Sequence, residues 1–220
     1  MHIVLTSEIL LAAYAQGLFP MAESAHSPYV HWYCPQERGQ LSICGLHIPK
    51  KLKKEVRQMC IGGKPYEIRI NTSFKAVIDA CAEHSATRPE TWINEEIKNA
   101  YIKLHEEGYA HSVECWQEEK LVGGLYGVAL GAAFFGESMF SCVSEASKVS
   151  LVHLAARLWK AEFKMLDTQF VNTHLEQFGV YEVYHDEYMR ELRPLLLQDC
   201  DFTLNIDESE LIAAYFMKCQ

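Results

Sequence analysis

The chain has 220 residues, 49% of them hydrophobic and 22% charged, an ordinary globular composition that excludes disordered, collagenous and coiled-coil proteins. No uninterrupted run of about 18 apolar residues occurs, so no membrane-spanning helix is expected. The formal net charge of −9 argues against a protein that binds nucleic acid over most of its surface. It does not exclude a local basic patch.

The first predicted element is a short helix over residues 5–17, which ends at Gly17 because glycine readily closes a helix in the left-handed conformation. The N-terminus carries a glutamate and lacks a basic n-region, so no signal peptide is expected. After a loop rich in serine, histidine and proline, the pattern changes. We place a boundary there between a small N-terminal domain, residues 1–45, and a main domain, residues 46–220.

The main domain is predicted to combine helices with a run of consecutive strands. Helices packed on a mainly antiparallel sheet make this an α+β fold. The expected elements are, in order, helix 49–58, strand 66–71, helix 73–84, a helix between Asn94 and Gly108, strands 111–117, 120–130 and 131–141, helix 146–163, strand 163–170, and helices 171–179, 186–196 and 208–218.

Local signals fix several of these ends. Pro49 is expected at the first helical position, where its missing N–H costs nothing. The Asn94 side chain is expected to cap its helix, and Gly108 to end it. Glu118 and Glu119 are expected to join two strands. The glycines of LVGGLYGV match no phosphate-binding loop, so we expect them where another part of the backbone approaches closely.

The cysteines and histidines show no metal-binding spacing. No two of the eight cysteines are closer than ten residues, and the ten histidines scatter along the chain without an HExxH motif. We therefore predict no metal site, and we expect reduced, mostly buried thiols. The cysteines are Cys34, Cys44, Cys60, Cys81, Cys115, Cys142, Cys200 and Cys219.

Two predicted strands carry polar residues among apolar ones. In GESMFS, the carboxylate of Glu137 is flanked by aromatic residues, and burying it without a partner is costly. In LDTQF, Asp167 and Gln169 are two residues apart and should face the same side of a strand. We expect a hydrogen-bonded pair in which Asp167 orients the Gln169 amide. The alternative for Glu137 is a structural ion pair with Lys148 or an arginine.

A basic segment, PKKLKKEVRQ, forms a local field opposite in sign to the net charge. At 3.6 residues per turn, four of its five cations fall on one helical face and Lys51 does not. Such a patch is expected where a phosphate backbone is held, and a solvated helix face is the alternative. The five cations are Lys50, Lys51, Lys53, Lys54 and Arg57.

Several motifs follow one another in a specific order. They include AYAQGLFPM at 13–21, WYCP at 32–35, LVGGLYGV at 121–128, GESMFS at 136–141 and LDTQ at 166–169. This order resembles that of the leucyl/phenylalanyl-tRNA–protein transferases. The resemblance spans about residues 7–180, and it implies a small N-terminal domain followed by a domain similar to the GNAT acetyltransferase superfold.

The resemblance implies transfer of Leu or Phe, with Met as a further donor, from aminoacyl-tRNA to an N-terminal Arg or Lys of an acceptor protein. The product is then marked for degradation by the N-degron pathway. Because the aminoacyl ester is already activated, catalysis needs orientation and oxyanion stabilisation, and we expect no cofactor. The expected partners are charged tRNA and acceptor proteins, for a cytoplasmic monomer that does not bind membranes.

The same resemblance assigns roles to residues. Gln169 is expected to contact the attacking amine, Asp167 to polarise it, and Glu137 to read an ammonium group in the substrate site. Trp32 and Tyr33 are expected to stack on the terminal adenine. The residues expected to form the apolar cavity for the donor side chain, with ordinary core packing as the alternative, are Trp92, Leu125, Phe134, Leu151, Leu154 and Leu158.

Departures from the family pattern leave alternatives open. Cys34, Glu145 and Cys142 stand where the family usually has Ser, Asn and Arg, and residues 182–185 replace a usual Ile-Pro-Arg. The acceptor preference can therefore differ from basic N-termini. A CoA-dependent acetyltransferase is a rival, although its pyrophosphate-binding turn is missing from the sequence. A non-catalytic RNA-binding module is a second rival, against which Asp167 and Gln169 argue.

Overall fold

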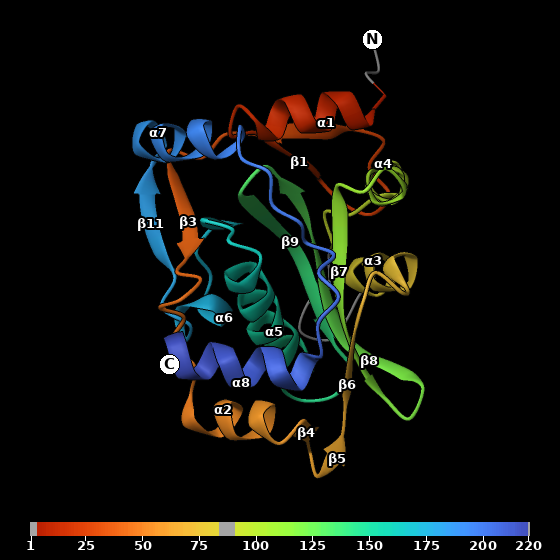
Figure 1. The fold of residues 1–220 in the computed structure, drawn as a ribbon. Coiled ribbons are helices and arrows are strands. Elements are labelled where there is room, and N and C mark those ends of the chain that lie inside the picture. The colour runs from red at the N-terminus through yellow and green to blue at the C-terminus, as the bar shows by residue number, and fades with distance from the viewer. Residues whose placement is uncertain (1–3, 84–90, 220) are drawn as a thin grey trace.

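The computed structural model describes residues 4–83 and 91–219 (Figure 1). Within these residues, eight helices and eleven strands confirm the predicted α+β class. The helices are α1 (Ser7–Tyr14), α2 (Lys50–Arg57), α3 (Phe74–Ala82), α4 (Glu95–Glu106), α5 (Ala146–Lys160), α6 (Thr173–Glu176), α7 (His185–Leu195) and α8 (Glu208–Cys219). The strands are β1 (Phe19–Ala22), β2 (Val30–Tyr33), β3 (Glu37–Leu41), β4 (Cys60–Ile61), β5 (Lys64–Pro65), β6 (Glu67–Ile70), β7 (Ala110–Gln117), β8 (Lys120–Leu130), β9 (Ala133–Ser141), β10 (Met165–Gln169) and β11 (Tyr181–Tyr184).

Seven strands form the central sheet, in the order β11-β3-β10-β9-β8-β7-β6. Every neighbouring pair is antiparallel except β9 and β10, which run parallel with Leu166 opposite Phe134. The predicted, mainly antiparallel sheet is therefore confirmed. Two small two-stranded sheets, β1-β2 and β4-β5, lie outside it. The similarity to the acetyltransferase superfold stays a prediction.

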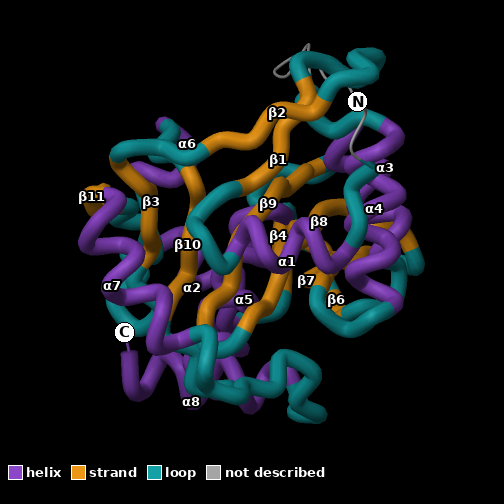
Figure 2. The backbone as a smooth tube through the Cα atoms, turned by 90° about the horizontal axis from the view of Figure 1, so that it is seen from above, coloured by secondary structure: helices purple, strands orange, loops and turns teal. Residues whose placement is uncertain are grey.

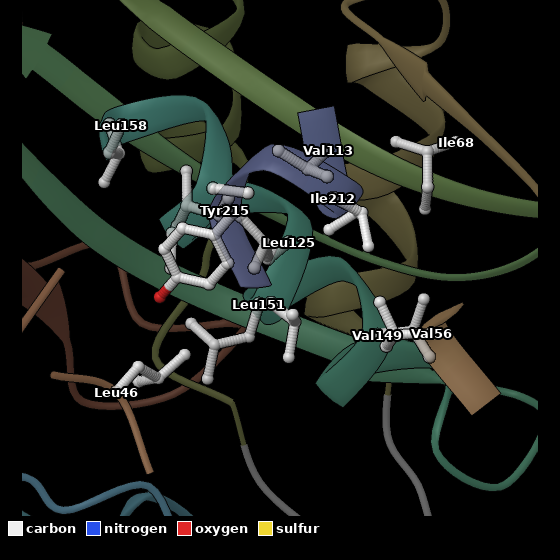
Figure 3. Close-up of a cluster of buried hydrophobic side chains, with 14 of the residues drawn as sticks. Leu46, Val56, Ile68, Val113, Leu125, Val149, Leu151, Leu158, Ile212 and Tyr215 are labelled. Carbon is white, nitrogen blue, oxygen red and sulfur yellow. The ribbon is translucent and has the colours of Figure 1, made fainter. Parts of the chain in front are cut away.

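The hydrophobic core consists of two clusters on opposite faces of the sheet. Neighbouring residues of one strand divide between them, since Leu125 belongs to the first cluster and Tyr126 to the second. In Figure 1, α5 and α8 lie on one side of the central strands, and α3 and α4 on the other. Figure 3 shows the first cluster, in which side chains of α5 and α8 such as Leu151 and Ile212 lie together.

Side-chain caps and turns mostly agree with the sequence. The Asn94 side chain accepts the Ile97 N–H at 2.9 Å, and Gly108 closes the helix with a φ of +85°. Glu118 and Glu119 both have positive φ and form the turn between β7 and β8. Pro49 precedes the first helical residue and does not occupy it. His84, where the third helix was expected to end, lies outside the described residues.

Glycine allows α5 to approach the sheet closely. A Cβ atom on Gly123 of β8 would lie 2.5 Å from the Cβ of Ala146, the first residue of α5. Such a separation is sterically forbidden, so the expectation of close backbone approach is confirmed here. The contact fixes the start of α5 over β8, and α5 is buried along most of its length.

Strand β3 lies between β10 and β11 and is therefore part of the central sheet. The sequence did not predict β3 or β11, because both are only four or five residues long and ERGQL is mostly polar. Their pairing with each other and with β10 supplies the backbone hydrogen bonds that define them. The domain boundary near residue 45 stays a prediction.

The prediction about cysteines was wrong in two respects. Cys44 and Cys219 form a disulfide with a Cα–Cα distance of 4.8 Å, although 175 residues separate them in sequence. Among the remaining cysteines only Cys81 and Cys115 are buried. Sequence spacing could not reveal the disulfide, because the two cysteines meet only when α8 packs beside the segment before α2.

Candidate active site

Polar residues of β9 and β10 meet where these parallel neighbours pass α1 and α7. The register places Asp167 opposite Phe135, two residues before Glu137. Helix α1 lies across β9 (Figure 2), and its Tyr14 ring is 4.9 Å from the Phe135 ring. The structure therefore brings Glu137, Asp167 and Gln169 together.

Asp167 is fully buried, and its carboxylate is satisfied by protein groups. Arg38 Nε donates to both carboxylate oxygens at 3.0 and 2.9 Å, and Arg38 Nη2 lies 2.8 Å from Oδ2. The Tyr188 hydroxyl donates to Oδ2 at 2.7 Å, and the Gln169 backbone N–H donates to Oδ1 at 2.7 Å. Such a charge-assisted, multiply bonded carboxylate is held rigidly.

The guanidinium of Arg38 is also enclosed. Its Cζ lies 4.6 Å from the ring centre of Phe19 and 4.9 Å from that of Tyr188, and Nη1 donates to the Gly17 carbonyl at 2.9 Å. Burial by itself lowers the pKa of Arg38, but the Asp167 carboxylate outweighs that effect and raises it. Arg38 therefore stays charged and neutralises Asp167 inside the protein.

The expected side-chain pair between Asp167 and Gln169 does not form. Asp167 instead accepts the backbone N–H of Gln169, and Gln169 has a φ of +64° where the register with β3 shifts. The left-handed residue ends the regular alternation of the strand, so the two side chains do not share one face. Asp167 thus fixes the backbone of Gln169 and not its amide.

Glu137 is half-buried and surrounded by neutral donors. It accepts from the Tyr14 hydroxyl at 2.7 Å, the Tyr101 hydroxyl at 3.1 Å and Gln169 Nε2 at 2.7 Å. Burial raises the pKa of Glu137 to about 8, although the tyrosine hydrogen bonds oppose this shift. Lys148, the alternative partner, pairs with Glu145 at 3.0 Å.

The hydrogen count of this cluster agrees with a protonated Glu137. The hydroxyls of Tyr14 and Tyr101 also hydrogen-bond to each other, so three contacts link two hydroxyls and one carboxyl group. Two hydroxyl hydrogens can occupy only two of these contacts. A protonated Glu137 carboxyl supplies the third hydrogen by donating to one of the two hydroxyls, in which case it accepts only from the other. A pKa near 8 allows this state at neutral pH.

The Gln169 amide has a defined orientation because Nε2 donates to Glu137. Its carbonyl oxygen, Oε1, forms no hydrogen bond within the described part of the chain, and the side chain is 8% exposed. Of the Glu137–Asp167–Gln169 cluster, Oε1 is the oxygen presented as a free acceptor. Such an atom can accept a hydrogen from an amine and thereby aim the nitrogen lone pair.

The predicted donor-cavity residues divide between the two core clusters. Trp92 is half-buried and packs against the second cluster, whereas the other five are buried in the first cluster around α5. Three of those five, Leu125, Leu151 and Leu158, are labelled in Figure 3. The five are Leu125, Phe134, Leu151, Leu154 and Leu158.

Trp32 and Tyr33 are successive residues of β2, so their side chains point to opposite faces. Trp32 is half-buried against the second core cluster. Tyr33 is 39% exposed, and its ring lies parallel to that of Phe19 with centres 6.1 Å apart. The two residues therefore do not form one stacking surface for a base.

The predicted basic face of α2 is confirmed. Four cations line one hollow of about 340 Å³, whereas Lys51 lies 3.9 Å from Glu55. Helix α2 and helix α1 lie at opposite ends of the molecule (Figure 1). The cations in the hollow are Lys50, Lys53, Lys54 and Arg57.

Four residues of the cluster were not assigned to the site from the sequence: Arg38, Tyr188, Tyr14 and Tyr101. Each is buried with its polar group bonded to Asp167 or Glu137. For two of them the sequence offered a weak indication: Tyr14 lies in the AYAQG motif, and Tyr101 is one of the regularly spaced apolar residues of α4. For Arg38 and Tyr188 it offered none, since they reach Asp167 from segments 129 and 21 residues away.

Neither a metal-binding cluster nor a membrane-spanning helix occurs in the described part of the chain. No group of three or more His, Cys, Asp or Glu side chains suited to a metal ion occurs in residues 4–83 and 91–219. Over the same residues, no helix combines the length and apolar character needed to span a bilayer.

Comparison with known proteins gives extensive matches. The family model described as "Leucyl/phenylalanyl-tRNA protein transferase" matches residues 41–193, and the model of the N-terminal domain of the same transferases matches residues 4–36. The two models meet between residues 36 and 41, which flank most of β3.

Three relatives carry the name leucyl/phenylalanyl-tRNA–protein transferase. The one from Paramagnetospirillum magneticum is 50% identical over 201 residues, covering 91% of this chain and 94% of the relative. The one from Hyphomonas neptunium is 50% identical over 195 residues, covering 89% and 74%. The one from Phenylobacterium zucineum is 51% identical over 193 residues, covering 88% and 85%.

Proposed function

This chain belongs to the leucyl/phenylalanyl-tRNA–protein transferase family, and we propose that it moves Leu or Phe, with Met as a further donor, from aminoacyl-tRNA to acceptor proteins. The acceptor residue is an N-terminal Arg or Lys, and the product enters the N-degron degradation pathway in the cytoplasm. Identity of 50% over nearly the whole of one relative supports the transferase activity.

The observation that carries the mechanism is the oriented Gln169 amide. With Nε2 held by Glu137, Oε1 accepts one hydrogen of the acceptor's α-amine. An α-amine has a reference pKa of about 7.7–8.0, so part of it is neutral near pH 7. The neutral nitrogen attacks the ester carbonyl, a C–N bond forms, and the C–O bond to the ribose breaks. The nitrogen loses a proton and the departing ribose oxygen gains one.

Asp167 acts in this scheme without touching the substrate. Its carboxylate is saturated by Arg38, Tyr188 and the backbone N–H of Gln169. Its role is to hold Gln169 in the left-handed conformation that turns the amide toward Glu137. We therefore assign Asp167 as a positioning residue, which differs from the polarising role that the family resemblance implied.

The Glu137 carboxyl has a pKa close to that of the attacking amine. Its pKa of about 8 falls in the range of an α-amine, so proton exchange between the two costs little free energy. The hydroxyls of Tyr14 and Tyr101 complete the hydrogen-bonded cluster through which that proton is shared. When ionised, Glu137 attracts an ammonium group, in agreement with the role expected from the sequence.

The remaining assignments follow the resemblance. Leu125, Phe134, Leu151, Leu154 and Leu158 form the apolar environment for the donor side chain, with Trp92 at its margin. An apolar pocket distinguishes side chains that differ by one methylene only about 10–200-fold, so mixed use of Leu, Phe and Met is expected. The cations of α2 hold the tRNA backbone. Tyr33, with its exposed ring, is the better candidate than Trp32 for stacking on the terminal adenine.

The direct test is a transfer assay with radiolabelled Leu or Phe on tRNA and peptides bearing each of the twenty N-terminal residues. We expect transfer to Arg and Lys without ATP or metal. Transfer confined to another N-terminus would establish the alternative acceptor preference. Transfer to none of the twenty would contradict the enzyme function.

Gln169→Met tests the mechanism, because methionine has a similar length but lacks the amide acceptor. We expect kcat to fall about 100-fold, as for other misplaced or missing orienting groups. Gln16→Met, at an exposed position of the chain, is the matched control and should leave kcat unchanged. Equal kcat values for the two variants would remove Gln169 from the mechanism.

The role of α2 is tested by two single charge reversals on the same helix. Lys54→Glu places a carboxylate in the cationic hollow, whereas Lys51→Glu changes a residue outside it. We expect the first variant to lose more tRNA affinity and to show a shallower salt dependence of binding. Equal losses for both would show that the hollow has no special role.

A further inference from the structure

Helix α8 follows the residues that the family models match, which end at 193. It is nevertheless anchored at both ends, so its position beside α2 (Figure 1) is fixed. The anchoring contacts are the Cys44–Cys219 disulfide, the 2.5 Å hydrogen bond from the Tyr215 hydroxyl to the Ile43 carbonyl, and the pairs of Glu208 with His153 and Arg157.

One ring of α8 lies against two cations of α2. Lys53 Nζ is 5.2 Å and Arg57 Cζ is 5.1 Å from the ring centre of Phe216. A cation over an aromatic face is attracted without being neutralised, unlike a cation paired with a carboxylate. Phe216 thus holds the side chains of Lys53 and Arg57 against α8.

Two hollows of different character meet at Arg57. The cationic hollow, of about 340 Å³, is lined by side chains of α2 and Gln58. A second hollow, of about 300 Å³, lies between α2 and α8 and also includes Arg57. Its walls are mainly apolar and include Met59, Ile212, Ala213, Phe216 and Met217. Among the described residues, no carboxylate forms an ion pair with Arg57.

We propose that α2 and α8 together bind one nucleotide of a single-stranded RNA segment, with its phosphate in the cationic hollow and its base in the apolar hollow. A nucleotide carries an anion on one side and a flat, largely apolar base on the other, which matches two adjoining hollows that share Arg57. This proposal rests on the proposed function, because the RNA in question is the unpaired end of the tRNA substrate.

The walls of the apolar hollow predict tolerance of base identity. The Ser209 hydroxyl, which borders the hollow, already donates to Asp207 at 2.5 Å. The base is therefore held by burial against apolar side chains and not by hydrogen bonds to its edges. Binding of this kind depends on the presence of a base much more than on which base it is.

The test uses an RNA hairpin with a single-stranded 3′ tail, in which each unpaired nucleotide is made abasic in turn. Fluorescence anisotropy measures the Kd of each RNA for the full chain. We expect one abasic position to weaken wild-type binding by about fivefold or more. Ala213→Leu fills the apolar hollow, so it should weaken binding of the intact tail and abolish sensitivity to that position.

Ala214→Leu is the matched control, since Ala214 neighbours Ala213 on α8 but does not line the hollow. It should retain the wild-type pattern. If Ala213→Leu binds the intact tail as tightly as wild type, or keeps its abasic sensitivity, the nucleotide site is wrong. Absence of any sensitive position in wild type overturns it equally.

Phe216→Leu separates ordering of the cations from general stability. It keeps an apolar side chain but removes the ring, and we expect KM for charged tRNA to rise about threefold with kcat unchanged. A lowered kcat with unchanged KM would show a purely structural role and contradict the proposal. Transfer measured at saturating tRNA reports the enzyme function independently of this site.

Discussion

Two carboxyl groups in this protein are withdrawn from water on opposite faces of the central sheet, and their surroundings differ. Glu137 is bonded to Tyr14, Tyr101 and Gln169, all of them neutral donors. Glu208 of α8 lies 2.7 Å from His153 Nδ1 and also pairs with Arg157. Burial acts to raise the pKa of both groups, yet their pKa values move in opposite directions.

The two carboxyl groups differ in whether neighbouring cations offset the effect of burial on the pKa. Burial raises the pKa of Glu208, but His153 and Arg157 outweigh it, and the pKa falls below its usual value. Among the described residues no cation contacts Glu137 to offset its burial, and its pKa rises to about 8. A compensated carboxylate anchors α8 and stays ionised, whereas an uncompensated one costs stability and offers a proton near neutral pH. The second arrangement is useful where a reaction moves protons.

The largest effect on activity is expected from changing Asp167. Asp167 holds the backbone of Gln169, and Gln169 in turn donates a hydrogen bond to Glu137. Asp167→Ala leaves Arg38 buried without its counter-ion and frees the backbone of Gln169. We expect kcat to fall at least about 100-fold while tRNA binding remains intact, because the change displaces an orienting group. Steady-state kinetics and a tRNA binding assay measure the two effects.

Asp167→Asn is the milder companion, since its amide oxygen can still accept the Gln169 N–H. It should retain more activity than the alanine variant. Loss of tRNA affinity with a normal kcat would reverse the roles assigned to Asp167 and to α2.

The next largest effect is expected on the opposite face. Glu208→Ala leaves the charge of Arg157 without its carboxylate partner, which typically costs about 3–5 kcal/mol. We expect a lower free energy of unfolding in urea but an unchanged kcat below the transition. A selective loss of kcat would mean that the two regions are coupled.

The pH dependence of this loss has a definite sign. Because the folded-state pKa of Glu208 is lowered, its contribution to stability is full above its unfolded pKa of about 4.5 and is lost as the pH falls through the folded value. Wild type and variant should therefore converge in acid.

The disulfide of α8 should give a somewhat smaller effect. Cross-links of this kind typically stabilise by about 2–4 kcal/mol. We expect dithiothreitol to lower the thermal midpoint of wild type, and Cys219→Ser to abolish this sensitivity to the reductant. Cys200→Ser, which removes a free thiol, should keep it. A midpoint that reductant does not change would show that the disulfide contributes nothing.

The last expected effect is a gain in stability at Glu137. Its folded-state pKa is raised, so the native state holds a proton between about pH 4.5 and 8 that the unfolded chain releases. Stability therefore falls as the pH rises through that window. Glu137→Gln removes this loss and should be more stable than wild type at pH 9, with little difference at pH 4.

Thermal unfolding across this pH range measures the difference, and the opposite signs at Glu137 and Glu208 make the comparison sharp. A Glu137→Gln variant that is less stable than wild type at pH 9 would show that the carboxylate is compensated after all.

Much of the fold was predictable because the signals are local. Three features depend on residues a few positions apart in sequence. They are the regularly spaced apolar residues of α5, the consecutive antiparallel strands β7, β8 and β9, and the Asn94 cap of α4. The polar residues of β9 and β10 were also visible, since Glu137 and Asp167 interrupt apolar strands. The motifs around them further identified the family.

What those residues do was decided by tertiary structure. The sequence alone determined the fold class, the family and the polar residues that break apolar strands, because periodicity and motif order are properties of neighbouring residues. Only the folded chain brought Arg38 and Tyr188 to Asp167, and Cys44 to Cys219, across separations of 129, 21 and 175 residues. The hydrogen-bond partners of a buried group come from such distant segments, so only the packing shows that Arg38, Tyr188 and the Gln169 N–H occupy the Asp167 carboxylate.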